Sequence, residues 1–481
     1  MKPFIPETRV EYYFAKLSEI PRLSQYEKAA SDYVMSVAES FGCACRQDDL
    51  WNVVVKIPAH KGYEHCSSLI LHAHLDMVGV ASGNHDFTRD PLTLYEDENG
   101  NIRAVNTTLG ADDGYGCAYM LAIMEDHDFP HPPLYLVFTT QEENGCYGAQ
   151  ALDFSDIDAE RMIGLDVMES EIENTCCLGC YCSDRITVHK EFREEENNDP
   201  AYELHLTGIE PVRTGMLVHP EQGNAIKLMA RLLEGLKDQF PFRLVSLTGG
   251  EAENYNPKEC TAVLTCRQPV EEPLRNVLAK AVNELDDGRQ EIHLDVHPVS
   301  SGPSLGEKDS HALVDFLYLL PSANIAFSPK DNTLGATNNV GIVSLQHGSF
   351  LLIMSDRART MDYKESLGKR IRILAGLYDM HARFETRYLP WVYNPESSLL
   401  KKTAALMEEF YGQKMVESIC PGGLEICDFL PKKPQLDCVM FAPIGGECHS
   451  IHEWLNRASF NRVYLFLCQL LTRLAEEETS V

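Results

Sequence analysis

The chain has 481 residues, 44% of them hydrophobic, and this length exceeds what one hydrophobic core usually organises, so we predict two domains. Its formal net charge of −30 argues against nucleic acids and anionic membranes as partners. No apolar run approaches the about 20 residues that a membrane span needs. The first residues lack the apolar region of a signal peptide, so we expect the sixteen scattered cysteines to stay reduced in the cytoplasm.

Strand and helix patterns alternate over the first 170 residues. Residues 8–42 have helical periodicity with a break at Pro21, and residues 52–57 (NVVVKI) are typical of a strand. The alternation then continues to about residue 170, which predicts an α/β sheet with helices on both faces.

A second series of elements begins at about Val188. Strand-like and helical segments alternate again, and the last of them, residues 365–383, is predicted to be a helix. We interpret this series as a second α/β domain inserted into the first. The predicted domains are a catalytic domain in two parts, residues 1–187 and 387–481, and an inserted domain, residues 188–386.

An apolar run, residues 69–71, leads into the ionisable residues His72, His74 and Asp76. The run is typical of a buried strand, and alternation along a strand places the three polar side chains on one face. Open α/β sheets build their sites at such carboxyl ends of strands. Imidazole is a common zinc ligand, and a carboxylate beside it can orient its ring.

Four further segments carry acids or histidine at equivalent places. Asp112 and Asp113 precede a predicted helix, and Glu142, Glu143 and Asp166 follow predicted apolar strands. His449 follows a glycine pair. A set of five nitrogen and oxygen ligands, including His74, suits two zinc ions that share a carboxylate, or manganese or cobalt in their place. Glu142 then remains as an unligated acid that can take a proton from a water.

The order of these motifs resembles that of a known family. HLDMV, TTLGADDG, EE, LD, GLE and HS follow one another as in the aminoacyl-histidine dipeptidase branch of the dinuclear zinc aminopeptidase and aminoacylase superfamily. The resemblance covers nearly the whole chain and is strongest over residues 70–170. It implies a zinc-peptidase-like catalytic domain, with a mixed central sheet flanked by helices, and an inserted α/β lid domain through which the family often dimerises.

The resemblance also implies a role for each motif residue. One metal ion would be held by His74 and Asp166, the other by Glu143 and His449, and Asp112 would bridge them. Asp76 would orient His74, and Glu142 would act as general base and then as general acid. The resemblance further implies a cis peptide bond between Asp112 and Asp113.

Other polar residues near these motifs receive different interpretations. We interpret His72 as a packed residue or a partner of a ligand, and Asp113 as part of a turn. We interpret His452 and Glu453 as residues of the rim. Glu425 matches a family glutamate near the substrate site.

The inserted domain departs from the family pattern. Arg213 and Thr214 stand where the family has the histidine and serine of a Gly-His-Ser-Gly motif, and Met354 stands where it has an arginine for the substrate carboxylate. Asn254 and Asn339 are kept. The metal centre is therefore expected to be intact, whereas the residues with which the inserted domain binds the substrate have changed.

These inferences favour a cytoplasmic metallo-dipeptidase of Xaa-His or broad specificity with two divalent ions. Its substrate would be a dipeptide or a small amide, and the resemblance allows a homodimer through the inserted domain. Two alternatives stay open. One is an N-acyl or carbamoyl amino-acid amidohydrolase, and the other is a non-catalytic metal-binding homologue, which the changes at Arg213 and Met354 motivate.

Overall fold

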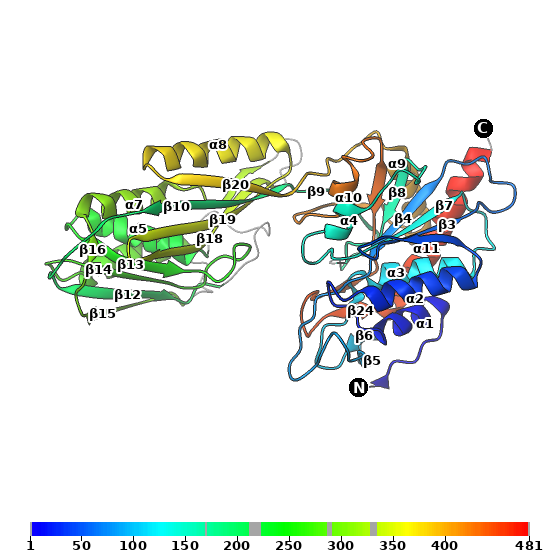
Figure 1. The fold of residues 1–481 in the computed structure, drawn as a ribbon, viewed down its shortest axis with the longest axis horizontal. Coiled ribbons are helices and arrows are strands. Elements are labelled where there is room, and N and C mark those ends of the chain that lie inside the picture. The colour runs from blue at the N-terminus through cyan, green and yellow to red at the C-terminus, as the bar shows by residue number, and fades with distance from the viewer. Residues whose placement is uncertain (1, 169–170, 211–222, 286–290, 328–333, 480–481) are drawn as a thin grey trace. The chain divides into compact units, whose positions relative to one another are not determined.

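A computed structural model describes residues 2–168, 171–210, 223–285, 291–327 and 334–479 of the chain (Figure 1). The chain forms two compact units. The first unit comprises Met1–Cys180, Trp391–Cys420 and Leu424–Val481, and the second comprises Tyr181–Pro390 with Pro421–Gly423. Within the described residues, no helix combines the length and the apolar composition that a bilayer crossing requires.

The first unit is built around an eight-stranded sheet with the strand order β2-β3-β7-β4-β8-β22-β9-β21. Its strands are β2 (Ala44–Gln47), β3 (Val53–Ile57), β4 (Leu69–His74), β7 (Leu134–Thr139), β8 (Arg161–Gly164), β9 (Thr175–Cys180), β21 (Val416–Cys420) and β22 (Asp437–Met440). The central strand β4 runs parallel to both of its neighbours, β7 and β8, whereas β2, β3 and β7 pair antiparallel. Every residue of β4 and of β7 is buried, as expected for a sheet covered on both faces.

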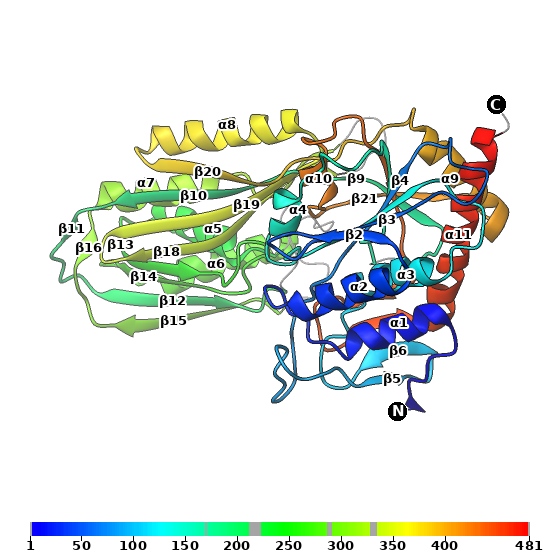
Figure 2. The same ribbon diagram turned by 45° about the vertical axis from the view of Figure 1, so that its right-hand side comes forward.

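Helices pack on this sheet, and a small sheet lies beside them. The helices are α1 (Arg9–Ser18), α2 (Lys28–Ser40), α3 (Ala111–Glu125), α4 (Tyr147–Ala151), α9 (Ser398–Tyr411), α10 (Ile426–Phe429) and α11 (Arg457–Thr479). Helix α3 packs against α1, α2 and β4 (Figures 1 and 2), and nearly all of its side chains are buried. The small sheet has the order β1-β5-β6-β24-β23, with β1 (Lys2–Pro3), β5 (Leu94–Glu96), β6 (Asn101–Ala104), β23 (Gly445–Gly446) and β24 (Trp454–Asn456).

The second unit contains a nine-stranded sheet in which all pairs are antiparallel. Its strands are β10 (Ser183–Glu191), β12 (Ala201–Thr207), β13 (Arg243–Gly249), β14 (Cys260–Thr265), β15 (His293–Val299), β17 (Ala323–Phe327), β18 (Leu334–Gln346), β19 (Ser349–Ala358) and β20 (His381–Tyr388), while β11 (Glu194–Glu195) pairs with β16 (Ser304–Leu305). The helices α5 (Ala225–Lys237), α6 (Glu271–Leu285), α7 (Glu307–Leu319) and α8 (Met361–Leu377) share one hydrophobic core with alternate strand residues. Alternation of buried and exposed residues along the strands is typical of an antiparallel sheet with one covered face.

The prediction of one helix over residues 365–383 was wrong in its second part. Helix α8 ends at Leu377, and the chain continues as strand β20. Asp379 has φ 54°, in the left-handed region in which a helix commonly ends. Strand β20 pairs antiparallel with β10, so a partner nearly 200 residues away in the sequence determines its conformation.

A buried polar cluster lies in the second unit where β10, β19, α8 and β20 meet. Lys364 Nζ donates to Asp184 Oδ1 at 2.6 Å and to Thr386 Oγ1 at 3.0 Å. The backbone N–H of Asp184 donates to Asp356 Oδ1 at 2.6 Å, whereas Asp356 Oδ2 is buried without a hydrogen-bond partner. Burial raises the pKa of Asp356 to about 7.

We expect Asp356 to make the stability of this unit pH-dependent. The unfolded chain releases this proton near the usual pKa of 3.8, so between pH 4 and 7 the folded state binds more protons than the unfolded state. The free energy of unfolding therefore falls as the pH rises through this window, by up to about 1.4 kcal/mol per pH unit. Asp356→Asn should raise the melting temperature in calorimetry at pH 8 and change it little at pH 4.

The exposed Asp295 on β15 offers a matched control. Asp295→Asn makes the same chemical change without removing a buried carboxyl, so we expect it to leave the pH dependence of the melting temperature unchanged. Equal effects of Asp356→Asn at pH 4 and pH 8 would contradict the assignment.

Candidate metal centre and active site

Three neighbouring parallel strands bring acids and a histidine to one edge of the first unit's sheet. His74 is the last residue of β4 and is in register with Thr139, the last residue of β7. Glu142 and Glu143 follow β7, and Asp166 is the second residue after the end of β8. Because β4, β7 and β8 are parallel, their carboxyl ends lie at the same edge of the sheet, where open α/β sheets bind ligands.

Asp112 lies between two histidines that come from distant segments. It is near the start of α3, whereas His449 belongs to the loop between β23 and β24. His74 Nε2 is 3.3 Å from Asp112 Oδ1, and His449 Nε2 is 3.4 Å from Asp112 Oδ2. Each oxygen of one carboxylate therefore faces a different imidazole, which is the arrangement that a bridging ligand needs. The Asp112–Asp113 peptide bond is cis, as the resemblance implies.

The ligand atoms gather into two groups that share Asp112. One group is His74, Asp112 and Asp166, and the other is Asp112, Glu143 and His449; within each group the ligand atoms lie within 4.8 Å of one another. His74 also forms such a group with Glu142 and Glu143. Among the described residues these groups contain nitrogen and oxygen donors and no cysteine, a donor set that suits zinc and also manganese or cobalt.

The charges of this cluster also fit divalent cations. Burial, followed by the negative charge of Asp166, raises the pKa of Glu142 well above its usual range. Burial and the charge of Asp112 raise the pKa of Asp166 in the same way. Buried carboxylates of like charge repel one another, and a bound cation relieves this repulsion.

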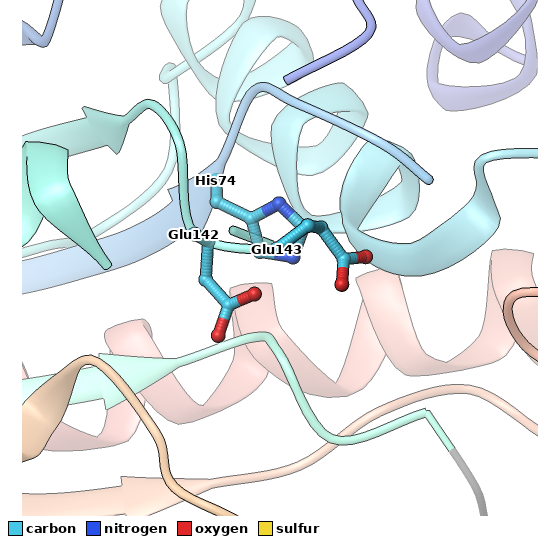
Figure 3. Close-up of side chains that lie close together, drawn as sticks. All are labelled: His74, Glu142 and Glu143. Carbon is cyan, nitrogen blue, oxygen red and sulfur yellow. The ribbon is translucent and has the colours of Figure 1, made fainter. Parts of the chain in front are cut away.

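Asp76 connects the ligand strand to the loop of the two glutamates. Its Oδ1 accepts the backbone N–H of Glu142 at 3.0 Å and its Oδ2 that of Glu143 at 3.1 Å. Asp76 Oδ1 is also 3.5 Å from His74 Nδ1, and Ser24 Oγ donates to Asp76 Oδ2 at 2.7 Å. Figure 3 shows His74 at the end of its strand, with the side chains of Glu142 and Glu143 diverging near the imidazole ring. Asp76 is thus placed to orient the His74 ring and both glutamates.

His72 and Glu425 form a buried pair next to this centre. His72 Nε2 is 2.9 Å from Glu425 Oε2, and Thr139 Oγ1 donates to the same oxygen at 2.5 Å. His72 belongs to none of the three candidate metal groups of the described residues, and its side chain packs edge-on against Phe429. Glu425 Oε1 is buried without a hydrogen-bond partner.

Glu453 lies deeper than a rim residue would, and Asp113 is also buried. Glu453 was interpreted as a rim residue, but it is only 3% exposed and accepts the backbone N–H groups of residues 109–112. Asp113 is fully buried, and its carboxylate accepts the N–H groups of His74 and Gly116, each at 3.3 Å. His452, in contrast, is exposed, as a rim residue should be.

Three residues that surround the centre were not predicted from the sequence: Arg22, Ser24 and Thr139. Each of them forms a hydrogen bond with a residue more than 50 positions away along the chain. Arg22 follows Pro21 at the break between two helices. A charged residue at such a break is expected to be exposed to solvent. No local periodicity could have identified it as a fully buried guanidinium.

The residues expected from the inserted domain lie in the second unit, except that Arg213 and Thr214 are outside the described residues. Asn339 Nδ2 donates to the backbone oxygens of Glu253 and Tyr255 at 2.9 and 2.8 Å, so it holds the loop that carries Asn254. Met354 is fully buried in the hydrophobic core of this unit. A charged side chain would be costly at that position.

Comparisons with known proteins agree with this geometry. The model of Peptidase family M20/M25/M40 matches residues 70–473. The chain is 28% identical over 480 residues to the cytosol non-specific dipeptidase of Escherichia coli K12, with 96% of each chain covered.

Solved structures of similar proteins share the fold of this chain. The aminoacylhistidine dipeptidase of Vibrio alginolyticus superposes with a TM-score of 0.85 at 25% identity, covering 98% of this chain and 97% of that one. A tripeptidase of Staphylococcus aureus shares the fold, with a TM-score of 0.59 at 14% identity over 98% and 99% of the two chains. Since the family model spans most of its length, the chain belongs to Peptidase family M20/M25/M40 and is a peptidase.

Proposed function

We propose that this peptidase is a two-metal dipeptidase that hydrolyses the amide bond of dipeptides in the cytoplasm. The observation that carries the proposal is the pair of ligand groups that share Asp112, with Glu142 outside both. The names of two similar proteins, a cytosol non-specific dipeptidase and an aminoacylhistidine dipeptidase, support the substrate class. The sixteen free cysteines are consistent with a reducing compartment.

The residues proposed to hold the metal ions follow from the two groups. His74 and Asp166 would bind one ion, Glu143 and His449 the other, and Asp112 both, with zinc as the proposed metal and manganese or cobalt as alternatives. Two divalent cations supply a Lewis acid for the scissile carbonyl and lower the pKa of a water.

Glu142 is the proposed general base. Its carboxylate lies beside the ligand cluster, and the hydrogen bond from its backbone to Asp76 fixes its position. Because it lies outside the two ligand groups that share Asp112, its carboxylate is available to accept a proton. It would take the proton from the attacking water and then donate it to the leaving amine.

The inserted domain predicted over residues 188–386, which lies within the second unit, is proposed to serve as a lid and as a dimerisation domain. Arg213 would then donate to the oxyanion in place of the family's histidine, which an arginine can do chemically. Asn254 and Asn339 of this unit and Glu425 of the first unit are proposed to contact the substrate. A buried methionine at position 354 leaves the substrate carboxylate to a different residue.

Hydrolysis of free and N-acetylated dipeptides tests the proposal. The protein loaded with zinc, manganese or cobalt should hydrolyse Xaa-His or other dipeptides, and N-acetylation should slow the reaction strongly. A chelator should abolish the activity, and the metal should restore it. Faster hydrolysis of the acetylated substrates would indicate an N-acyl amino-acid amidohydrolase, and two bound ions without any turnover would indicate a non-catalytic homologue.

A further inference from the structure

The loop that carries Asp112 is held by a carboxylate from the far end of the chain. Glu453 Oε2 accepts the backbone N–H groups of Leu109 at 2.8 Å and Gly110 at 3.0 Å. Its Oε1 accepts those of Ala111 at 2.8 Å and Asp112 at 3.3 Å. One buried carboxylate therefore binds four consecutive amide groups at the start of α3, where a helix leaves its first N–H groups without partners.

A buried guanidinium holds the same loop through its carbonyl side. Arg22 is 2% exposed and donates to the backbone oxygens of Leu75 at 3.0 Å, Asp76 at 3.2 Å and Gly110. A Cβ atom on Gly110 would lie 2.6 Å from Arg22 Nη2, and Gly110 has φ 65°, so only glycine fits this approach. Arg22 thus connects the end of the strand that carries His74 to the loop that carries Asp112.

Glu453 also lies on the segment that carries His449, one of the proposed metal ligands. Strands β23 and β24 enclose residues 447–453, which contain His449, and β24 pairs with β6 in the small sheet. The segment therefore presents His449 to one oxygen of Asp112 and, four residues later, holds the backbone of Asp112 itself. Glu453 therefore links the backbone position of Asp112 to the loop that carries His449.

We propose that Glu453 is a positioning residue of the metal centre, which sets the place of the Asp112 carboxylate between His74 and His449, with Arg22 as its counterpart on the carbonyl side of the loop. This role rests on the proposed two-metal function. Hydrogen bonds to a charged group are stronger than neutral ones. The buried carboxylate of Glu453 therefore fixes the four backbone N–H groups that donate to it. Loss of a residue that orients a metal ligand typically lowers metal affinity by about 10–100-fold.

A purely structural helix cap predicts a different outcome. Such a cap would lower the stability of the fold without a selective change in metal affinity. Glu11 of α1 offers the matched control, because it is 1% exposed and its carboxylate accepts from the backbone of Glu7 and from the side chains of Arg457 and Asn461. Its partners include none of the proposed metal ligands.

The test is a titration of the metal-free full-length protein with Zn²⁺ or Mn²⁺, followed by calorimetry or by competition with a fluorescent chelator. The wild-type protein and Glu11→Gln should bind two ions with the same affinity, even if Glu11→Gln melts at a lower temperature. Glu453→Gln places an amide NH₂ against backbone N–H groups, and we expect it to lose about 10–100-fold in affinity for at least one ion.

Two further variants keep the test decisive if Glu453→Gln does not fold. Glu453→Asp keeps the charge but shortens the side chain, and Arg22→Lys keeps a cation but loses the planar fork. Both should show a smaller rise in melting temperature on metal addition than the wild-type protein. Wild-type affinity in all three variants would overturn the positioning role alone, whereas a wild-type protein that binds no divalent ion would overturn the proposed function and this role with it.

Discussion

Glu142→Gln is expected to lower kcat for dipeptide hydrolysis by about 10²–10⁴-fold, the usual contribution of a general acid–base residue. The amide keeps the shape of the side chain but cannot accept a proton from water. Glu142 belongs to neither of the two ligand groups that share Asp112, so the variant should still bind two metal ions. Steady-state kinetics with a saturating dipeptide, together with metal analysis of the same samples, measures both quantities.

The exposed Glu160 ahead of β8 provides the control for this substitution. Glu160→Gln removes the same charge from the same unit and should leave kcat unchanged. If Glu142→Gln were as active as the wild-type protein, the proposed general base would be wrong even if the metal centre were correct. Loss of a metal ion in Glu142→Gln would instead assign Glu142 to the metal ligands. The metal analysis tests this directly, because Glu142 also forms a candidate metal group with His74 and Glu143.

Asp112→Asn is expected to abolish measurable hydrolysis and to weaken both metal sites. The two ligand groups share this one carboxylate, so the substitution removes a negative charge and an anionic oxygen from both at once. The loss of affinity should exceed the about 10–100-fold that removal of a residue orienting a ligand costs. Titration of the metal-free variant with zinc or manganese measures the effect on each site.

The adjacent Asp113 offers a close control, because its carboxylate accepts the backbone N–H groups of His74 and Gly116 and joins none of the candidate metal groups of the described residues. An asparagine can still accept one of these hydrogen bonds. Asp113→Asn should therefore bind two ions, although the fold becomes less stable. If the two adjacent substitutions had equal effects on metal binding, Asp112 would not be the shared ligand.

Local pattern and the geometry of parallel strands account for much of the candidate site. Apolar runs that end in polar residues predicted strands that end at His74, Glu142 and Asp166, and parallel neighbours in one sheet place their carboxyl ends together. The alternation of strand and helix patterns predicted an α/β sheet with helices on both faces, and the resemblance implied that the sheet is mixed, as its parallel and antiparallel pairs confirm. The family that the motif order resembles is the family to which the chain belongs.

Other features depend on contacts that no local pattern encodes. The end of α8 at Leu377 and the strand that follows are determined by pairing with β10, and the helical periodicity of residues 365–383 did not indicate this change. Glu453 was interpreted as a rim residue because a charged side chain after a loop histidine is usually solvated. Its burial follows only from the backbone N–H groups that α3 presents to it.

The sequence by itself therefore determined which side chains could carry the chemistry, since strand ends and glycine-flanked turns are short-range features. Only the tertiary structure decided which charged residues hold those side chains in place, as Arg22 and Glu453 do for the loop before α3. The physical reason is that a buried charge is stable only where distant segments supply its hydrogen-bond partners, and such partners are brought together by folding rather than by neighbourhood in the chain.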